Sequence, residues 1–266
     1  NRALKDRPAD FVMNFSTNLV NAFFDPESDA VYFGTGGTDN KNRNLGLASD
    51  IIYHEYTHWV VERVFPLSNF GQSGAISEGV ADFFALDSYN GLAGNPPKTT
   101  FGEWVFPGGT CGPTGASCRD VNNTKKYPND WQGEIHYDGQ IIAGALWDLR
   151  TVVGYKAART LVSSSLFYFP DSFDSFLDAM WAVSGGTYDG AITTAFANHG
   201  IGAWPYASAD PLEPNNGFAN AKTLTLGESP QATVFPAGDV DYFRFVAGAG
   251  PVKITLTRPF LNEALL

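Results

Sequence analysis

Apolar residues recur at helical spacing in several segments of the chain. The clearest stripe lies in residues 172–183, where apolar side chains fall at i, i+3, i+4, i+7 and i+8: Phe173, Phe176, Leu177, Met180 and Trp181. Such a stripe is typical of an amphipathic helix that faces a core. Residues 45–63, 76–89 and 189–198 predict further helices. The last of these is expected to end at Gly200, a C-cap position.

Shorter apolar runs bounded by turn residues predict strands. Residues 21–24 and 30–34 flank the turn residues 25–29 and predict a strand–turn–strand unit. Just before them, residues 11–20 predict a helix that leads into a strand. Residues 90–130 are rich in Gly, Pro, Asn and Thr and predict a long loop, which in a compact domain is typically functional or disordered.

The composition is that of a soluble folded protein. Of the 266 residues, 44% are hydrophobic, which is enough for a sizeable core, and the formal net charge is −11. This acidity argues against nucleic acid as a partner, because phosphate backbones are bound by basic patches, and it favours a monomer that resists self-association. No apolar run approaches the ~18 residues of a membrane span. The chain opens without the features of a secretion signal, so we expect any such signal to have been removed.

The strongest chemical signal is a His-Glu-x-x-His pattern formed by His54, Glu55 and His58. On a helix, side chains four positions apart lie on one face, so both imidazoles can reach one metal ion. Neutral imidazole is a good Zn²⁺ ligand, and a catalytic zinc takes three protein ligands and leaves one position for water. The carboxylate of Glu55 can take a proton from that water. For this pattern alone, the alternative is a surface helix with two exposed histidines.

A third ligand is predicted at Glu78, 78 − 58 = 20 positions after His58. This spacing leaves room for a loop and the start of a second helix. Asp82 follows one helical turn later, where its carboxylate can accept the free ring N–H of a zinc histidine and fix its tautomer.

Together these residues resemble the gluzincin metallopeptidases of the thermolysin and fungalysin families, and residues 77–84 are similar to the fungalysin segment. The resemblance covers residues 18–204. It implies an α+β, thermolysin-like zincin with a short N-terminal β part and a mainly helical C-terminal part. It also implies a secreted zinc endopeptidase in which His54, His58 and Glu78 bind Zn²⁺ and Glu55 is the catalytic base.

The same resemblance assigns an oxyanion donor. Residues 134–147 look like the fungalysin pattern Glu-Val-His followed by a helix that ends near Leu-Trp. In that family the histidine, here His136, donates to the oxyanion of the tetrahedral intermediate. A carboxylate is expected to orient the ring, and Asp130 and Glu134 are both candidates.

Substrate contacts are also implied. Asn21 and Ala22 are similar to the start of the edge strand with which the family holds an extended substrate. Arg119 falls in the region of a substrate-binding arginine, with a surface guanidinium as the alternative. Asn69 stands where the thermolysin family has a tyrosine that binds the transition state, so this role is left unassigned.

Two further features bear on stability. Cys111 and Cys118 lie in a Gly/Pro-rich loop and are expected to form a local disulfide in an oxidising compartment, with two free thiols as the alternative. Asp50 matches a calcium ligand of the thermolysin family, but Tyr89 stands where a partner ligand is expected. Ca²⁺ is therefore a secondary expectation beside Zn²⁺, and a helix N-terminal Asp is the alternative.

The composition changes after residue 204. Residues 205–212 are typical of a linker, and residues 213–266 contain alternating runs that predict strands at 223–226, 241–245 and 252–257. This segment resembles the pre-peptidase C-terminal (PPC) domain, a small β-sandwich appended to secreted bacterial peptidases. We therefore expect a catalytic domain in residues 1–204 and a partial β-sandwich in residues 213–266.

The sequence leaves two alternatives to an endopeptidase. One is a non-catalytic zinc-binding adhesin or toxin-like binding protein on a peptidase scaffold, although pure binding does not need Glu55. The other is a zinc peptidase that acts on chain ends, for which no motif that grips a free α-amine is visible.

Overall fold

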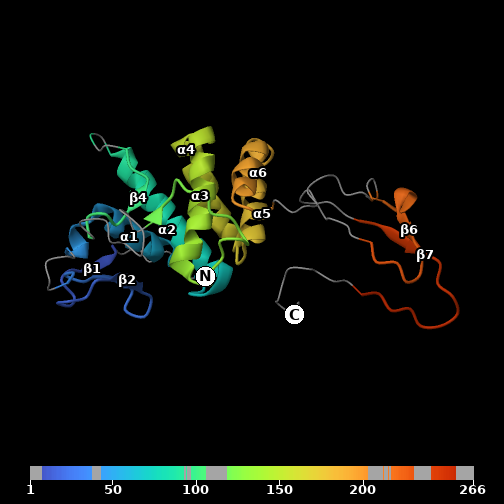
Figure 1. Cartoon of the computed structure of the whole chain (residues 1–266), viewed down its shortest axis with the longest axis horizontal. Helices are drawn as coiled ribbons and strands as arrows, with labels where there is room; N and C mark the ends of the chain where they lie inside the picture. The colour runs from blue at the N-terminus through green and yellow to red at the C-terminus, as the bar shows by residue number, and fades with distance from the viewer. Residues whose placement is uncertain are drawn as a thin grey trace. The chain divides into compact units, whose positions relative to one another are not determined.

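The structure is a computed structural model that describes residues 8–37, 43–92, 94, 97–105, 119–202, 212, 215, 217–230 and 241–255. The chain divides into two compact units, residues 1–204 and residues 205–266. Figure 1 shows the elements of both units in chain order.

A three-stranded sheet opens the first unit. β3 (Ala30–Phe33) lies in the middle, parallel to β1 (Asp10–Val12) and antiparallel to β2 (Ala22–Asp25). β2 and β3 form the hairpin that the strand–turn–strand pattern predicts. Because β2 has only one partner in this sheet, its other edge can pair with an extended chain.

The prediction of a helix in residues 11–20 is wrong. This segment contains β1 followed by turns. Its apolar residues serve the sheet instead: the ring of Phe15 lies edge-on to Phe23 at 5.8 Å and to Tyr32 at 4.7 Å. The apolar spacing was mixed, and these contacts with distant strands, rather than local periodicity, determine the conformation.

The two helices predicted to carry His54, His58 and Glu78 are both present. After a 3₁₀ turn, η1 (Leu45–Leu47), come α1 (Ser49–Val64) and α2 (Gly71–Gly91). α2 begins earlier than the sequence predicted and includes Gly74, a poor helix former. A Cβ on Gly74 would lie 2.6 Å from Ile135 Cγ2, so close packing accounts for a glycine inside this helix.

The rest of the first unit is mainly helical, and α3 to α6 follow one another along the chain (Figure 1): α3 (Ile135–Val153), α4 (Tyr155–Ser165), η2 (Leu166–Tyr168), α5 (Phe173–Ser184) and α6 (Asp189–Asn198). α3 packs against both α2 and α6. The stripe predicted for α5 faces the core, with Phe176 and Met180 fully buried. α4 lies outside the helices that the sequence predicted. A short pair, β4 (Thr100–Phe101) and β5 (Arg119–Asp120), lies within the segment predicted as a long loop.

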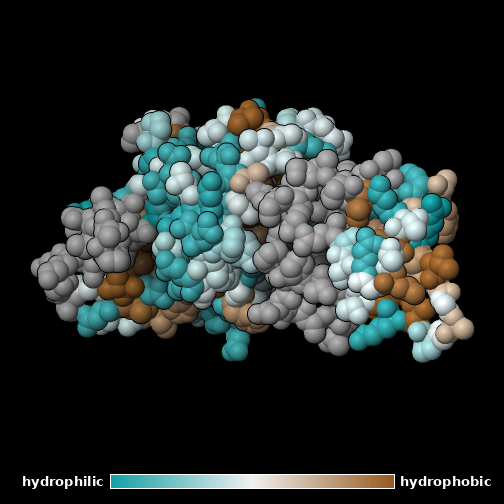
Figure 2. Space-filling view, turned by 45° about the vertical axis from the view of Figure 1, so that its right-hand side comes forward, coloured by the Kyte–Doolittle hydropathy of each residue, from teal (hydrophilic) through white to brown (hydrophobic). Residues whose placement is uncertain are grey.

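The second unit contains a 3₁₀ turn, η3 (Phe218–Asn220), and two parallel strands, β6 (Lys222–Leu224) and β7 (Phe243–Phe245). These strands overlap two of the predicted ones, whereas residues 252–255 contain none. The described residues of this unit therefore do not complete a β-sandwich, and the PPC domain stays a prediction. Figure 2 shows apolar atoms gathered over this unit, at the right of the view. Its exposed apolar side chains include Phe218, Val246 and Ile254.

In the described part of the chain, no helix is both long and apolar enough to cross a membrane.

Candidate metal centre

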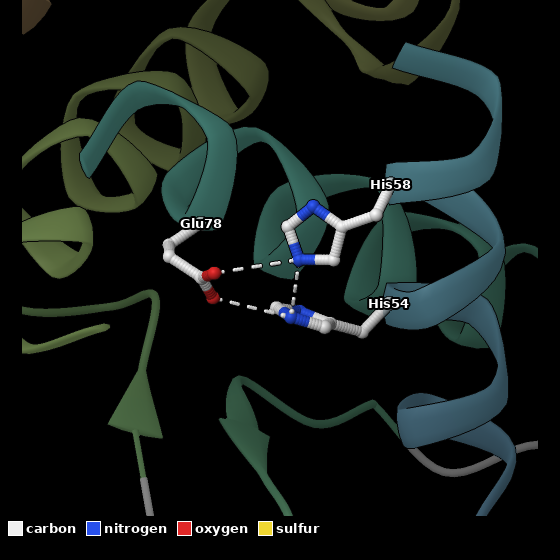
Figure 3. A group of neighbouring side chains, drawn as sticks. All are labelled: His54, His58 and Glu78. Atoms are coloured by element: carbon white, nitrogen blue, oxygen red, sulfur yellow. Dashed lines mark hydrogen bonds and ion pairs between the residues drawn. The ribbon is translucent and has the colours of Figure 1, made fainter. Parts of the chain in front are cut away.

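Three side chains from two helices converge on one point (Figure 3). His54 and His58 lie one turn apart on α1, and their Nε2 atoms are 3.0 Å apart. Glu78 reaches them from α2, with Oε2 3.2 Å from His54 Nε2 and Oε1 3.5 Å from His58 Nε2. The structure thus brings together the three residues that the sequence predicted as ligands, and they form a group that could hold a metal ion.

The spacing of these atoms fits a zinc ion. Two ligand atoms, each roughly 2.0–2.1 Å from a tetrahedral zinc, are about 3.3–3.4 Å apart. The two Nε2 atoms are 3.0 Å apart, and each lies 3.2 or 3.5 Å from one of the two carboxylate oxygens of Glu78, which is close to this value. Two imidazoles and one carboxylate are also the donor set of catalytic zinc sites that keep a position open.

The charges around the three ligands stabilise a cation. Burial lowers the pKa of the His54 imidazole, but Asp82 and Glu78 outweigh burial and raise that pKa to about 10. Burial raises the pKa of Glu78, yet the nearby His58 and His54 hold it well below its usual range. A site whose buried carboxylates favour positive charge this strongly is suited to a metal dication, which would replace the proton on His54.

Asp82 links the first ligand to a buried guanidinium. Its Oδ1 lies 2.8 Å from His54 Nδ1, and the residue is fully buried. Arg119 donates to the same carboxylate from Nε at 2.6 Å and from Nη2 at 2.8 Å. Burial raises the pKa of Asp82, but Arg119 and His54 together lower it below its ordinary value. Asp82 therefore stays ionised and can hold Nε2 of His54 toward the metal position.

Arg119 lies close to the candidate metal centre, where its guanidinium is hydrogen-bonded to Asp82. Its guanidinium also lies 4.3 Å from the centre of the Phe101 ring, and that ring packs 5.0 Å from the His54 imidazole. Arg119 lies in β5 and Phe101 in β4, so the pairing of these two strands positions the guanidinium against Asp82 of α2 and the Phe101 ring against His54 of α1. These contacts differ from the alternative expected from the sequence, in which Arg119 is a surface residue whose guanidinium is solvated.

The second histidine has a partner that sequence reasoning missed. Ser77 Oγ lies 3.1 Å from His58 Nδ1. A serine directly before a ligand carries no distinctive signal, because its role depends on how α2 passes α1. The two ligand histidines are thus oriented differently, one by a carboxylate and one by a hydroxyl.

His136 begins α3 at the edge of the same site. Its Nε2 lies 3.7 Å from Glu78 Oε2, and its Nδ1 lies 2.6 Å from Glu134 Oε1. Glu134 also caps α3 by accepting the backbone N–H of His136 and Tyr137. Asp130 accepts the Lys126 N–H instead. Of the two carboxylates left open by the sequence, Glu134 is the one that contacts the ring.

The candidate ligands, Glu55 and His136 line one cleft of about 400 Å³. It is lined by the three ligands, Glu55 and His136, by β2 with the preceding Asn21, and by the end of α1 with the loop after it, including Val61, Glu62, Leu67, Ser68 and Asn69. Glu55 and Ala22 are both buried. The outer strand β2 therefore forms one wall of the cleft that contains the ligand atoms.

The contacts of Asp50 give no support to calcium. Its carboxylate is buried and accepts hydrogen bonds from Lys98 Nζ at 2.9 Å, from Gly102 N at 2.8 Å and from Ile51 N at 3.0 Å. Lys98 Nζ also lies 4.7 Å from the centre of the Tyr89 ring. A lysine ammonium thus occupies the place beside Asp50 where a calcium ion was expected. Cys111 and Cys118 lie outside the described residues.

Comparisons with known proteins agree with this chemistry. No protein-family model matches the chain. A zinc metalloproteinase of Listeria monocytogenes is 27% identical over 199 residues, which cover 68% of this chain and 36% of that protein. The chain resembles zinc metalloproteinases. The gelatinase of Enterococcus faecalis is 29% identical over 201 residues, which cover 69% of this chain and 38% of the relative. The chain therefore spans little more than a third of the length of these curated relatives.

A solved structure supports the fold. The precursor of protealysin, a metalloproteinase from Serratia proteamaculans, superposes with a TM-score of 0.63 at 17% identity, covering 73% of this chain and 69% of that one. At this identity the likeness speaks for the fold alone. The mixed α/β arrangement is consistent with the thermolysin-like fold that the sequence predicted.

Proposed function

We propose that this chain is a secreted zinc endopeptidase that hydrolyses internal bonds of peptides or proteins. The observation that carries the proposal is that one cleft holds His54, His58 and Glu78, close enough together to bind one metal ion, together with Glu55 and His136. The similarity to proteins named zinc metalloproteinase and gelatinase supports it. The expected disulfide and the resemblance to peptidases with PPC domains support secretion.

His54, His58 and Glu78 would hold the zinc ion. When bound, zinc supplies Lewis acidity, which lowers the pKa of a water molecule and polarises the scissile carbonyl. Asp82 would fix the tautomer of His54 by accepting the proton of Nδ1, which leaves the lone pair of Nε2 free to bind the metal. At His58, the hydroxyl of Ser77 takes the corresponding place beside Nδ1, without the charge of a carboxylate.

Glu55 and His136 would carry the proton transfers and the charge stabilisation. Glu55 lines the cleft beside His54, so its carboxylate can accept a proton from water and pass it to the leaving amine. His136 faces the ligand group with Nε2, while Glu134 accepts from Nδ1. This arrangement fixes the ring so that Nε2 can donate to the oxyanion of the substrate.

The outer strand β2 would hold the substrate. Asn21 and Ala22 lie where this strand enters the cleft, so an extended peptide can add to its edge. The resemblance also implies a substrate contact for Arg119, whose guanidinium is paired with Asp82 and does not line the described cleft. Binding along a strand edge accepts a chain that continues in both directions, and this favours cleavage of internal bonds over chain ends.

The direct test is zinc content combined with cleavage of an unstructured protein, with and without a chelator. We expect one zinc per chain and fragments cut at internal positions, identified by mass spectrometry. Release of single terminal residues would support the alternative that acts on chain ends. A chain that binds zinc and cleaves nothing would support the non-catalytic binding protein.

A further inference from the structure

The carboxylate of Asp50 holds both ends of one short segment. Asp50 lies one helical turn before His54 on α1, and its side chain is only 2% exposed. Its Oδ2 accepts hydrogen bonds from Lys98 Nζ at 2.9 Å and from Gly102 N at 2.8 Å. Residues 98–102, the anchored segment, are therefore held at both ends against the helix that carries two of the candidate ligands.

The anchored segment places an aromatic ring against the first ligand. The Phe101 ring is buried, and its centre lies 5.0 Å from that of the His54 imidazole. An imidazole that contacts both a buried ring and the carboxylate of Asp82 has few orientations open to it. Because ordering a loose side chain costs free energy on binding, a histidine held in this way binds a metal ion more tightly than one that is free to turn.

The same segment also positions the other neighbour of His54. Phe101 is paired with Arg119 between β4 and β5. Arg119 donates twice to Asp82, and the Oδ1 of Asp82 lies 2.8 Å from His54 Nδ1. A displacement of the anchored segment would therefore disturb both the ring and the carboxylate that orient His54.

Lys98 supplies the positive charge that balances Asp50. Its Nζ also lies 3.0 Å from Glu103 Oε2 and 4.7 Å from the centre of the Tyr89 ring. Its backbone is held by Asn90 of α2, which accepts from Lys98 N at 2.9 Å and donates to Lys98 O at 2.7 Å. A buried carboxylate that loses its cation keeps an uncompensated charge, which is strongly destabilising. The ammonium of Lys98 therefore stabilises Asp50 in its buried position.

We infer that Lys98 and Asp50 are positioning residues for the candidate metal centre: their ion pair holds the anchored segment, and this segment fixes the orientation of His54. Both act through other residues, because neither is one of the three candidate ligands. The inference rests on the proposed function, since it concerns the zinc site, and adds the part of the chain that preorganises this site before the metal binds.

The test compares two substitutions of Lys98 in the full chain. Lys98→Met removes the ammonium but keeps an unbranched stem, whereas Lys98→Arg keeps the charge. Competition with a zinc-binding dye should show an affinity about tenfold lower in Lys98→Met, the lower end of the loss that is typical for a changed partner of a metal ligand. Lys98→Arg should recover most of this loss, because a guanidinium also binds a carboxylate. With Co²⁺ in place of zinc, the visible absorption bands report ligand geometry and should shift in Lys98→Met.

A second comparison determines whether Lys98 acts through the anchored segment. Phe101→Leu removes the ring that lies against His54 and should itself weaken zinc binding. The loss caused by Lys98→Met should then be smaller in the Phe101→Leu background than in the wild type, because one neighbour of His54 is already gone. Fully additive losses would show that Lys98 does not act through this segment and would overturn the inference.

Arg159→Met is the matched control, because it also removes a cation from a buried carboxylate. Arg159 donates to Asp87 of α2, which is paired with Arg150 as well, and none of the three lines the described cleft. Arg159→Met should lower thermal stability, as Lys98→Met does, but keep the wild-type zinc affinity and cobalt spectrum. If Lys98→Met keeps the wild-type affinity, or if Arg159→Met loses as much, the ion pair of Lys98 contributes only to stability and the inference is overturned.

These measurements do not depend on cleavage. A wild type that binds one zinc and cleaves no peptide would refute the endopeptidase proposal, whereas the affinities of the variants would still decide the role of Lys98. A wild type that binds no zinc would overturn both.

Discussion

Gly139 of α3 lies directly against Glu78 of α2. A Cβ on Gly139 would come within 2.8 Å of the Glu78 Cβ, 3.0 Å of the Gly79 N and 3.1 Å of the Ala75 O. Two of these neighbours are backbone atoms, which cannot move without shifting α2. The absence of a side chain at Gly139 thus sets the separation between α2, which carries Glu78, and α3, which carries His136 in its first turn.

The first prediction follows from this contact. Gly139→Ala should destabilise the first unit by about 1–3 kcal/mol, the usual cost of overpacking, and should weaken zinc binding because Glu78 is displaced. Thermal unfolding and zinc titration measure the two effects. Gly190→Ala is the control: Gly190 lies in α6 with no atom near the position of its Cβ, so the helix should gain up to about 1 kcal/mol. Equal stability of the two variants would contradict the close packing.

The second prediction separates Glu55 from the ligands. Glu55→Gln should keep one zinc per chain, because Glu55 is outside the ligand group, but it removes the proton acceptor. General-base loss typically costs ~10²–10⁴-fold in rate. Glu78→Gln is the comparison and should lose zinc as well as activity. The measurements are metal analysis and kcat on a quenched peptide, and a Glu55→Gln enzyme that cleaves as fast as wild type would refute the mechanism.

The third prediction concerns His136 and its partner Glu134. His136→Ala removes one oxyanion donor and should cost about 10²–10³-fold in kcat, with much less change in KM, because the donor acts mainly on the tetrahedral species. Glu134→Gln keeps an oxygen that can accept from Nδ1 and should lose less. Both variants should bind zinc like wild type. A loss confined to KM would instead assign His136 to substrate binding.

Features of the candidate site were predictable from the sequence where they depend on local spacing, and not where they depend on how distant segments pack together. His54 and His58 were predictable because a spacing of four places both on one face of any helix, and Glu78 because a second helix returns to the first. Ser77 and Gly139 were not, because their roles depend on how α2 passes its neighbours. The choice of Glu134 over Asp130 depends on where each side chain points at the start of α3, and neighbouring positions in sequence do not determine this.

Asp50 and Arg119 show the limit of transferring a family pattern. Each occupies the position that the resemblance indicated, but its contacts are set by this chain. Asp50 faces Lys98, a residue from a segment whose sequence gave no regular pattern. Arg119 faces Asp82 through a two-residue strand that is too short to leave a periodic signal.

The fourth prediction compares the partners of the two ligand histidines. Asp82→Asn removes the charge that fixes His54 and leaves the buried guanidinium of Arg119 without its counter-ion. Zinc affinity should fall about 10- to 100-fold, as is typical when the partner of a metal ligand is changed, and thermal stability should fall as well. Ser77→Ala removes only a hydroxyl from His58, so we expect a loss of about tenfold or less and almost no change in stability. Competition with a zinc-binding dye measures the affinities. Equal effects of the two substitutions would show that the ion pair of Asp82 with Arg119 contributes nothing to the metal site.

The last prediction concerns the two units. Cutting the chain after Trp204 removes the second unit, and the residues of the first unit already contain the ligands, the cleft and a shared core. The shortened chain should therefore unfold cooperatively and bind one zinc with unchanged affinity, because a domain with its own core folds alone. Calorimetry and zinc titration of both forms measure this. If the shortened chain loses cooperative unfolding, or if its zinc affinity falls, the first unit depends on the second for its stability and the boundary predicted from the sequence is wrong.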